Sequence, residues 1–253
     1  MELDGAGVVV TGAAAGIGEA LARRFAAAGA RVVVADLDGP GVTRVAESIG
    51  ALAVPGDAAS AEGVAHLVAA ARAHLGEIDL YCANAGVGGA SSLDDEAGWD
   101  LAWQVNVLAH VRAARELLPA WLERGSGRFL ATVSAAGLLT MLGAPAYSAT
   151  KHGALAFAEW LSATYADRGV VVQALCPQGV RTAMLEASGK AGELLLAETA
   201  ITPEAVADAV MAGLDGESFL ILPHPEVAAY YAGRAADTDR WLAGMRRAQR
   251  LLD

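Results

Sequence analysis

Short apolar runs alternate with longer alanine-rich stretches along most of this 253-residue chain. "GVVVTG", "RVVVADL" and "ALAVPGD" are the first three runs, and "SFLILP" is the last. Runs with almost no polar alternation predict strands that are buried on both faces, and the stretches between them predict covering helices. Right-handed crossovers place such helices on both sides of a parallel sheet. We therefore expect an α/β fold, a doubly wound parallel sheet of about seven strands.

The order of the segments predicts a single domain over residues 1–253, because no linker, repeat or low-complexity stretch divides the chain. Long helical regions are expected at about 97–124 and 147–168. A lid is expected at about 182–200, and its glycines, Gly189 and Gly192, suit a mobile segment. The stretch at about 225–252 falls outside the repeating pattern, so we interpret it as a C-terminal helical extension.

The composition limits the partners and the compartment of the protein. A formal net charge of −11 argues against nucleic acid or an anionic membrane as the main partner. Acidic residues in "MELDGAGVVV" stand where a signal peptide carries basic ones, and no uninterrupted apolar stretch reaches ~20 residues. Cys82 and Cys176 each end an apolar run, which favours free core thiols in a reducing cytoplasm. Two cysteines and five scattered histidines predict no metal site.

A glycine-rich turn follows the first predicted strand, where Gly12, Gly16 and Gly18 lie in "TGAAAGIG". Such a turn lets the backbone approach a pyrophosphate, and the helix that begins there directs its free N–H groups at it. Asp36 closes the second strand about 20 residues further on, as in dinucleotide-binding units. Its carboxylate can accept hydrogen bonds from both adenosine ribose hydroxyls and would repel a 2′-phosphate. The alternative is a plain turn residue in "ADLDG".

A tyrosine and a lysine lie four residues apart in "AYSATKHGAL", residues 146–155. Residues at this spacing share one helix face, so Tyr147 and Lys151 project into the same space. A free tyrosine has a pKa of about 10, and a nearby ammonium would lower it towards the working pH. The pair therefore suits proton transfer, although alone it is more often a solvated helix pair.

Taken together, these motifs resemble those of the short-chain dehydrogenase/reductase family over nearly the whole chain, which implies a Rossmann-type fold. The matching positions follow the family's order: Thr11, Gly12, Gly16, Ile17 and Gly18 in the glycine turn; Asp57 and Ala58 after the third strand; Asn84, Ala85 and Gly86 after the fourth; Asn106 in the long helical region; Ser134 after the fifth strand; and then Tyr147 and Lys151.

The resemblance implies hydride transfer between NAD(H) and an alcohol or ketone. Tyr147 would move the hydroxyl proton, and Ser134 would orient the substrate oxygen. Lys151 would also hold the nicotinamide ribose, and Asn106 would anchor a water that connects Lys151 to solvent. His152 falls on a different helix face and is assigned no chemistry.

NAD(H) is expected rather than NADP(H). Family members that use the phosphorylated cofactor carry a basic residue at positions that are Ala15 and Leu37 here. The segment "CPQGVRTAM" resembles the family's PGxVxT motif, in which Val180 and Thr182 would meet the nicotinamide carboxamide and Pro177 also matches. Gln178 stands where glycine is usual, which leaves the shape of the pocket open.

The expected substrate is a hydrophobic secondary alcohol or ketone. The predicted contacts are mostly apolar, and sugars would leave buried polar partners unmatched. They are Ser134, Leu138, Met141, Leu142, Tyr147, Gln178, Met184, Leu185 and Leu195. A homo-oligomer, with a tetramer favoured, is expected because the two long helical regions carry more apolar surface than one buried stripe needs.

Two other functions remain open at this point. One is an NAD-binding regulatory or scaffold protein without net turnover. The other is an epimerase or dehydratase on the same scaffold. The identity and stereochemistry of the substrate and the physiological direction are not determined by the sequence.

Overall fold

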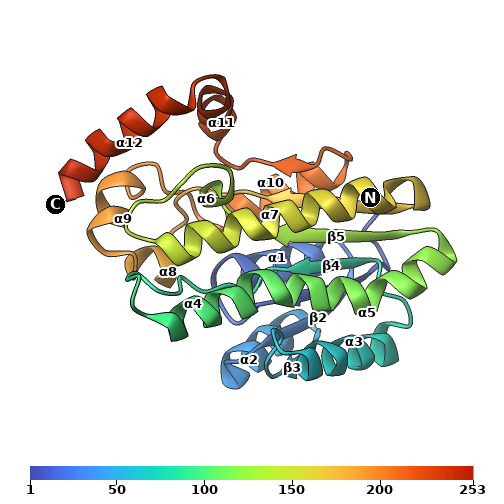
Figure 1. Cartoon of the computed structure of the whole chain (residues 1–253). Helices are drawn as coiled ribbons and strands as arrows, with labels where there is room; N and C mark the ends of the chain where they lie inside the picture. Colours follow the sequence, from blue (N-terminus) through green and yellow to red (C-terminus); the bar gives the residue numbers. More distant parts are fainter. Residues whose placement is uncertain (253) are drawn as a thin grey trace.

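A seven-stranded parallel sheet forms the centre of the computed structural model, which describes residues 1–252 (Figure 1). The strand order is β3-β2-β1-β4-β5-β6-β7, and every neighbouring pair is parallel. The predicted doubly wound α/β fold is thus confirmed. The strands are β1 (Gly7–Thr11), β2 (Arg31–Asp36), β3 (Leu52–Pro55), β4 (Leu80–Ala83), β5 (Gly127–Thr132), β6 (Val170–Leu175) and β7 (Leu220–Ile221).

Helices cover both faces of the sheet, and each face has its own hydrophobic core. Val9 contributes to the core under α3, α5 and α7, whereas its neighbours Val8 and Val10 contribute to the core under α1, α2 and α10. Because successive strand residues point to opposite faces, a sheet covered twice needs apolar residues at every position. This explains the uninterrupted valine runs. The larger helices are α1 (Gly16–Ala27), α2 (Gly39–Ile49), α3 (Ala61–Leu75), α5 (Ala109–Arg124), α7 (Pro145–Tyr165) and α10 (Pro203–Leu214).

The long helical region expected at 97–124 is divided by one wide turn. It consists of α4 (Glu96–Trp103), a π-helix (Gln104–Leu108) and α5. Asn106 lies in the π-helix and is fully buried. Such wide turns within α-helices are frequently found at functional sites.

Short helices and a C-terminal arm complete the chain. α6 (Ala135–Leu138) follows β5, and α8 (Ala183–Glu186) and α9 (Gly189–Leu195) lie in the segment interpreted as a lid. The region at about 225–252 forms α11 (Glu226–Ala236) and α12 (Thr238–Leu252), which extend beyond the sheet and its covering layers (Figure 1). Among residues 1–252, no helix combines the length and the apolar character that crossing a bilayer requires.

His110 on α5 is an unusual core residue. Only 1% of it is exposed, its ring packs edge-on against Phe129, and neither ring nitrogen has a hydrogen-bond partner among the described residues. Burial lowers the pKa of His110 to about 3, and the nearby charge of Lys151 acts in the same direction. His110 is therefore neutral in the folded protein at neutral pH.

We predict that His110 makes the protein less stable in mild acid. Below a pH of about 6.5 the unfolded chain binds a proton that folded His110 refuses, so its contribution to the free energy of unfolding falls as the pH drops towards 3. The slope from this residue is at most about 1.4 kcal/mol per pH unit. Urea denaturation between pH 5 and 8 should show that the free energy of unfolding of His110→Leu rises relative to that of the wild type as the pH falls. If the two free energies change in parallel with pH, the prediction is wrong.

Candidate active site

The carboxyl ends of β1 and β4 are tied together by the hydroxyl of Thr11. It accepts hydrogen bonds from the backbone N–H groups of Asn84 (3.0 Å) and Ala85 (3.1 Å), and it donates to the carbonyl of Cys82 (3.3 Å). The amide of Asn84 donates back to the carbonyls of Thr11 (2.9 Å) and Gly12 (3.2 Å). The crevice at this edge is where open parallel sheets bind nucleotides, because the strand order reverses there.

The glycine turn between β1 and α1 has the shape that a phosphate needs. Gly12 and Gly16 have φ values of 64° and 59°, which favour glycine. A Cβ on Gly18 would lie 2.0 Å from the carbonyl oxygen of Gly12, so the helix can approach the turn this closely only with glycine there. Ala15 caps α1 without a side-chain hydrogen bond, which leaves the N–H groups of the first turn free. These residues, with Ile17 in that first turn, fit a pyrophosphate.

Asp36 lies directly beside this turn, at the end of β2. One carboxylate oxygen accepts from the backbone N–H of Ala14 (3.0 Å), and the other accepts from that of Asp38 (3.0 Å). Leu37 next to it is 77% exposed. After β3, Asp57 accepts from the N–H of Ala59 (2.8 Å), which shapes the loop that contains Ala58. The residues expected around an adenosine therefore line the same edge.

Ser134, Tyr147 and Lys151 come together from two adjoining elements. Ser134 caps α6, where its Oγ accepts a hydrogen bond from the N–H of Ala136 (3.1 Å). The side chain of Ser134 is also hydrogen-bonded to that of Tyr147. The Nζ of Lys151 lies 5.6 Å from the centre of the Tyr147 ring and donates to the carbonyl of Thr132 (2.9 Å). A Cβ on Gly86 would lie 3.3 Å from this Nζ, so the loop after β4 closes the same space.

The pKa values of this pair differ from the sequence-based expectation. Burial raises the pKa of Tyr147 above 10, although the hydrogen bond with Ser134 acts against it. Burial also lowers the pKa of Lys151 to about 8. The expected lowering of the Tyr147 pKa by Lys151 is therefore not present in this structure. The main cause is desolvation of the phenol, and the Lys151 ammonium donates its hydrogen bond to the carbonyl of Thr132.

Asn106 holds the loop after β4 against α7. Its Oδ1 accepts from the N–H of Val87 (3.0 Å), and its amide donates to the carbonyl of Val87 (2.9 Å) and to the hydroxyl of Thr150 (3.0 Å). Both amide hydrogens are thus used within the protein, so the side chain of Asn106 links the loop after β4 to α7. The water that the sequence assigned to Asn106 remains a prediction.

The segment after β6 lies between Ser134 and the glycine turn. The carbonyl of Pro177 accepts from the N–H of Ala135 (2.8 Å) and faces the Oγ of Ser134 at 3.5 Å. The Cγ2 of Thr182 lies 3.2 Å from the position of a Cβ on Gly16, while its hydroxyl donates to the carbonyl of Val180 (3.2 Å). This segment therefore runs from the Ser134 side of the site to the glycine turn.

Gln178, the departure from the family motif, is fixed by a residue that sequence reasoning missed. Its backbone N–H donates to Nδ1 of His224 (3.1 Å), and His224 is 3% exposed. The Oε1 of Gln178 and the Nε2 of His224 are buried without a hydrogen-bond partner among residues 1–252. "LPHPEV" gave no signal for this contact, because His224 lies 46 positions beyond Gln178.

Not all of the apolar residues expected to contact the substrate are accessible in the structure. Leu138 is only 1% exposed and belongs to the core under α3, α5 and α7, so it does not line the site as expected. Met184 is 45% exposed, and Met141, Leu142, Leu185 and Leu195 are half-buried. Both backbone groups of Met141 bond to the hydroxyl of Ser148, which fixes this loop to α7.

His152, to which the sequence assigned no chemistry, joins the C-terminal arm to α7, the helix that carries Tyr147 and Lys151. Its Nδ1 lies 2.8 Å from the carbonyl of Ser148, and its Nε2 lies 2.9 Å from the guanidinium of Arg234 on α11. A carbonyl only accepts and a guanidinium only donates, so these contacts fit a neutral ring with the proton on Nδ1. Arg234 also donates to the carbonyl of Leu138, so α11 is bonded to both α6 and α7.

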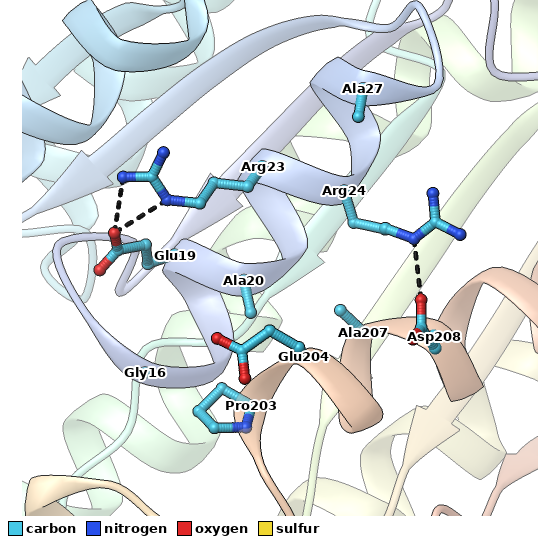
Figure 2. Close-up of a pocket in the computed structure, with 10 residues that line it drawn as sticks. All are labelled: Gly16, Glu19, Ala20, Arg23, Arg24, Ala27, Pro203, Glu204, Ala207 and Asp208. Carbon is cyan, nitrogen blue, oxygen red and sulfur yellow. Dashed lines mark hydrogen bonds and ion pairs between the residues drawn. The ribbon is translucent and has the colours of Figure 1, made fainter.

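A groove of about 330 Å³ between α1 and α10 is separate from these residues (Figure 2). The ion pair of Arg24 and Asp208 (2.8 Å) crosses it, and Arg23 pairs with Glu19 beside it. Ser134, Tyr147 and Lys151 do not line it, so we assign it no part in the chemistry.

Comparison with known proteins identifies the family. The family model for short chain dehydrogenases matches residues 6–192. A 1-deoxy-11-beta-hydroxypentalenate dehydrogenase of Streptomyces exfoliatus is 37% identical over 243 residues, which is 89% of this chain and 86% of that protein. The chain therefore belongs to the short-chain dehydrogenase/reductase family, as the motifs indicated.

Solved structures agree with this assignment. A short-chain dehydrogenase/reductase of Burkholderia phymatum, in complex with NAD, superimposes with a TM-score of 0.84 at 27% identity, over 94% of this chain and 96% of that one. A 3-ketoacyl-(acyl-carrier-protein) reductase of Brucella melitensis, complexed with NADH, gives a TM-score of 0.80 at 29% identity, over 87% and 96%.

We predict opposite effects for alanine at two helical glycines. Gly18→Ala forces its Cβ against the carbonyl of Gly12 and should lower the free energy of unfolding by about 1–3 kcal/mol. Gly233→Ala on α11 is the matched control, because nothing lies within 4 Å of its Cβ position. It should be neutral or stabilise by up to about 1 kcal/mol. Chemical denaturation measures both, and equal effects would contradict the close approach.

Proposed function

We propose that this protein is an NAD-dependent oxidoreductase that interconverts a hydrophobic secondary alcohol and its ketone. The observation that carries the proposal is the convergence of Ser134, Tyr147 and Lys151 at the same sheet edge as a glycine turn whose helix N–H groups are free. The relative from Streptomyces exfoliatus, whose name describes a dehydrogenase of a hydroxyl-bearing compound, supports the reaction class.

In this proposal the cofactor, when bound, accepts or supplies the hydride, and the protein handles the proton. Ser134 holds the substrate oxygen, since its Oγ already lies at the end of β5 beside Tyr147. Tyr147 takes the hydroxyl proton during oxidation and returns it during reduction. Lys151, with its lowered pKa, binds the nicotinamide ribose and stabilises the tyrosinate.

The raised pKa of Tyr147 also fits this role. A buried phenol keeps its proton until a positive charge arrives, and oxidised nicotinamide carries such a charge. We infer that proton removal therefore depends on a filled cofactor site. The pocket over this centre would be formed by Met141, Gln178, Met184 and Leu185.

The cofactor preference rests on Asp36. Its carboxylate borders the glycine turn, and neither Ala15 nor Leu37 offers a cation to a 2′-phosphate. The structural relatives from Burkholderia phymatum and Brucella melitensis, which are bound to NAD and NADH, support the same choice.

A homo-oligomer, with a tetramer favoured, and a cytoplasmic location complete the proposal. Trp103 on α4 and Trp160 on α7 are 43% and 55% exposed, which supports further burial of these helices in an assembly. Cys82 and Cys176 are buried, free thiols, which supports a reducing compartment.

NADH absorbance with a panel of secondary alcohols tests the function, and Tyr147→Phe is its control. We expect oxidation of aryl-alkyl or alicyclic alcohols and poor activity on polyols. Tyr147→Phe should reduce turnover by about 10²–10⁴-fold, because the proton acceptor is lost. NADH binding should change little, since the ring still fills its place. Turnover of the variant near that of wild type would overturn the role of Tyr147, and absence of NADH with every alcohol would favour a scaffold protein or an epimerase.

We also predict a preference for NAD over NADP that can be reversed. Asp36→Ala with Leu37→Arg replaces a repelling carboxylate by a cation, so kcat/KM should shift towards NADP by about tenfold or more. Leu37→Arg alone should shift it less, because the carboxylate remains. Equal use of both cofactors by the wild type would contradict the role of Asp36.

A further inference from the structure

The C-terminal helix α12 is amphipathic but has no buried residue. Trp241, Met245, Ala248 and Leu252 recur at helical spacing and would normally form a core-facing stripe. All four are only half-buried, and Leu242 and Leu251 are 45% and 68% exposed. A helix gains most of its stability from packing an apolar face, so this surface is incompletely covered in a single chain.

The outer side of α12 is basic, although the protein as a whole is acidic. The helix carries Arg240, Arg246, Arg247 and Arg250 against one acidic residue, Asp239, in a chain of formal net charge −11. All four arginines are exposed. Within residues 1–252, none of them forms an ion pair with a carboxylate.

A matching surface lies on the segment 91–103, which leads into and includes α4. It is exposed and acidic, and it also carries apolar side chains that are open to solvent: Leu93 is 80%, Leu101 52% and Trp103 43% exposed. Its acidic residues, which form no ion pairs within the described chain, are Asp94, Asp95, Glu96 and Asp100.

We propose that α12 of one copy docks on the segment 91–103 of a second copy of this chain. The two surfaces complement each other in charge and in apolar character, and each is left open within its own chain. Opposite charges steer such an encounter and fix its register, while the leucines and tryptophans on both sides supply the burial. An acidic body makes a second copy a better match for α12 than an anionic membrane, which would repel the rest of the protein.

The docking also bears on the proposed lid. Lys190 on α9 donates to the carbonyl of Leu252 at the end of α12 (2.7 Å), and Figure 1 shows α12 reaching from α11 towards α9. At its other end, α12 follows α11, which Arg234 bonds to α6 and α7. A second copy that holds α12 would therefore restrain both sides of the site.

Charge reversal tests the docking without relying on enzymatic activity. Arg246→Glu with Arg250→Glu, and separately Asp94→Arg with Asp100→Arg, place like charges on the two surfaces. Each pair should raise the dissociation constant of the assembly by about tenfold or more in sedimentation velocity. The chain that carries all four changes restores the opposite charges and should recover wild-type association.

Glu47→Arg with Glu62→Arg on α2 and α3 is the control for the Asp94 and Asp100 pair. These exposed residues make the same change of charge as that pair, but away from both surfaces. Association unaffected by either reversed pair, or not recovered by the fourfold change, would overturn the proposal. So would a wild-type monomer. A membrane could occupy α12 in place of a second copy. In that case the wild type would bind phosphatidylglycerol vesicles, Arg246→Glu with Arg250→Glu would abolish this binding, and association between copies would be unchanged.

Discussion

The junction of β1 and β4 is the constraint on which the site depends. Thr11 and Asn84 exchange hydrogen bonds across the two strand ends, and Gly12 and Gly18 approach each other too closely for any side chain. This junction fixes where α1 begins and directs its uncapped first turn at one point. The glycine turn, the Asp36 carboxylate and the loop at Gly86 all lie around it.

Burial shifts the pKa values of Tyr147, Lys151 and His110, but not all in the same direction. It raises the pKa of Tyr147, and it lowers those of Lys151 and His110. In each case the neutral form is favoured, because a charge is costly where water is excluded. Lys151, with a pKa of about 8, still carries most of its charge at neutral pH, whereas Tyr147 keeps its proton. In the proposed reaction the positive charge of the oxidised cofactor would favour loss of that proton, which would couple proton transfer to cofactor binding.

The C-terminal arm gives the site a second support outside the sheet. Arg234 reaches the carbonyl of Leu138 and the ring of His152, so one guanidinium joins α11 to the two elements that carry Ser134 and Tyr147. His224 fixes the backbone of Gln178 from the start of the same arm. The chain from His224 to α11 is therefore bonded to α6, to α7 and to Gln178, while α12 beyond it carries the surface proposed for a second copy.

The sequence by itself determined the sheet, its covering helices and the family. Periodicity is a local property, and motifs such as "TGAAAGIG" and "AYSATKHGAL" lie within single strand-turn-helix or helical segments. Asp36 and Tyr147 were singled out by the same local patterns, and Ser134 by the order of the family's motifs. Only the tertiary structure decided the π-helix at Asn106, the burial of Leu138 in the core, and the contacts of His152 with Arg234 and of Gln178 with His224. The tertiary structure likewise decided the sign of the Tyr147 pKa shift. Each of these depends on packing between residues far apart in the chain, and desolvation by that packing can outweigh a neighbouring charge that the sequence makes evident.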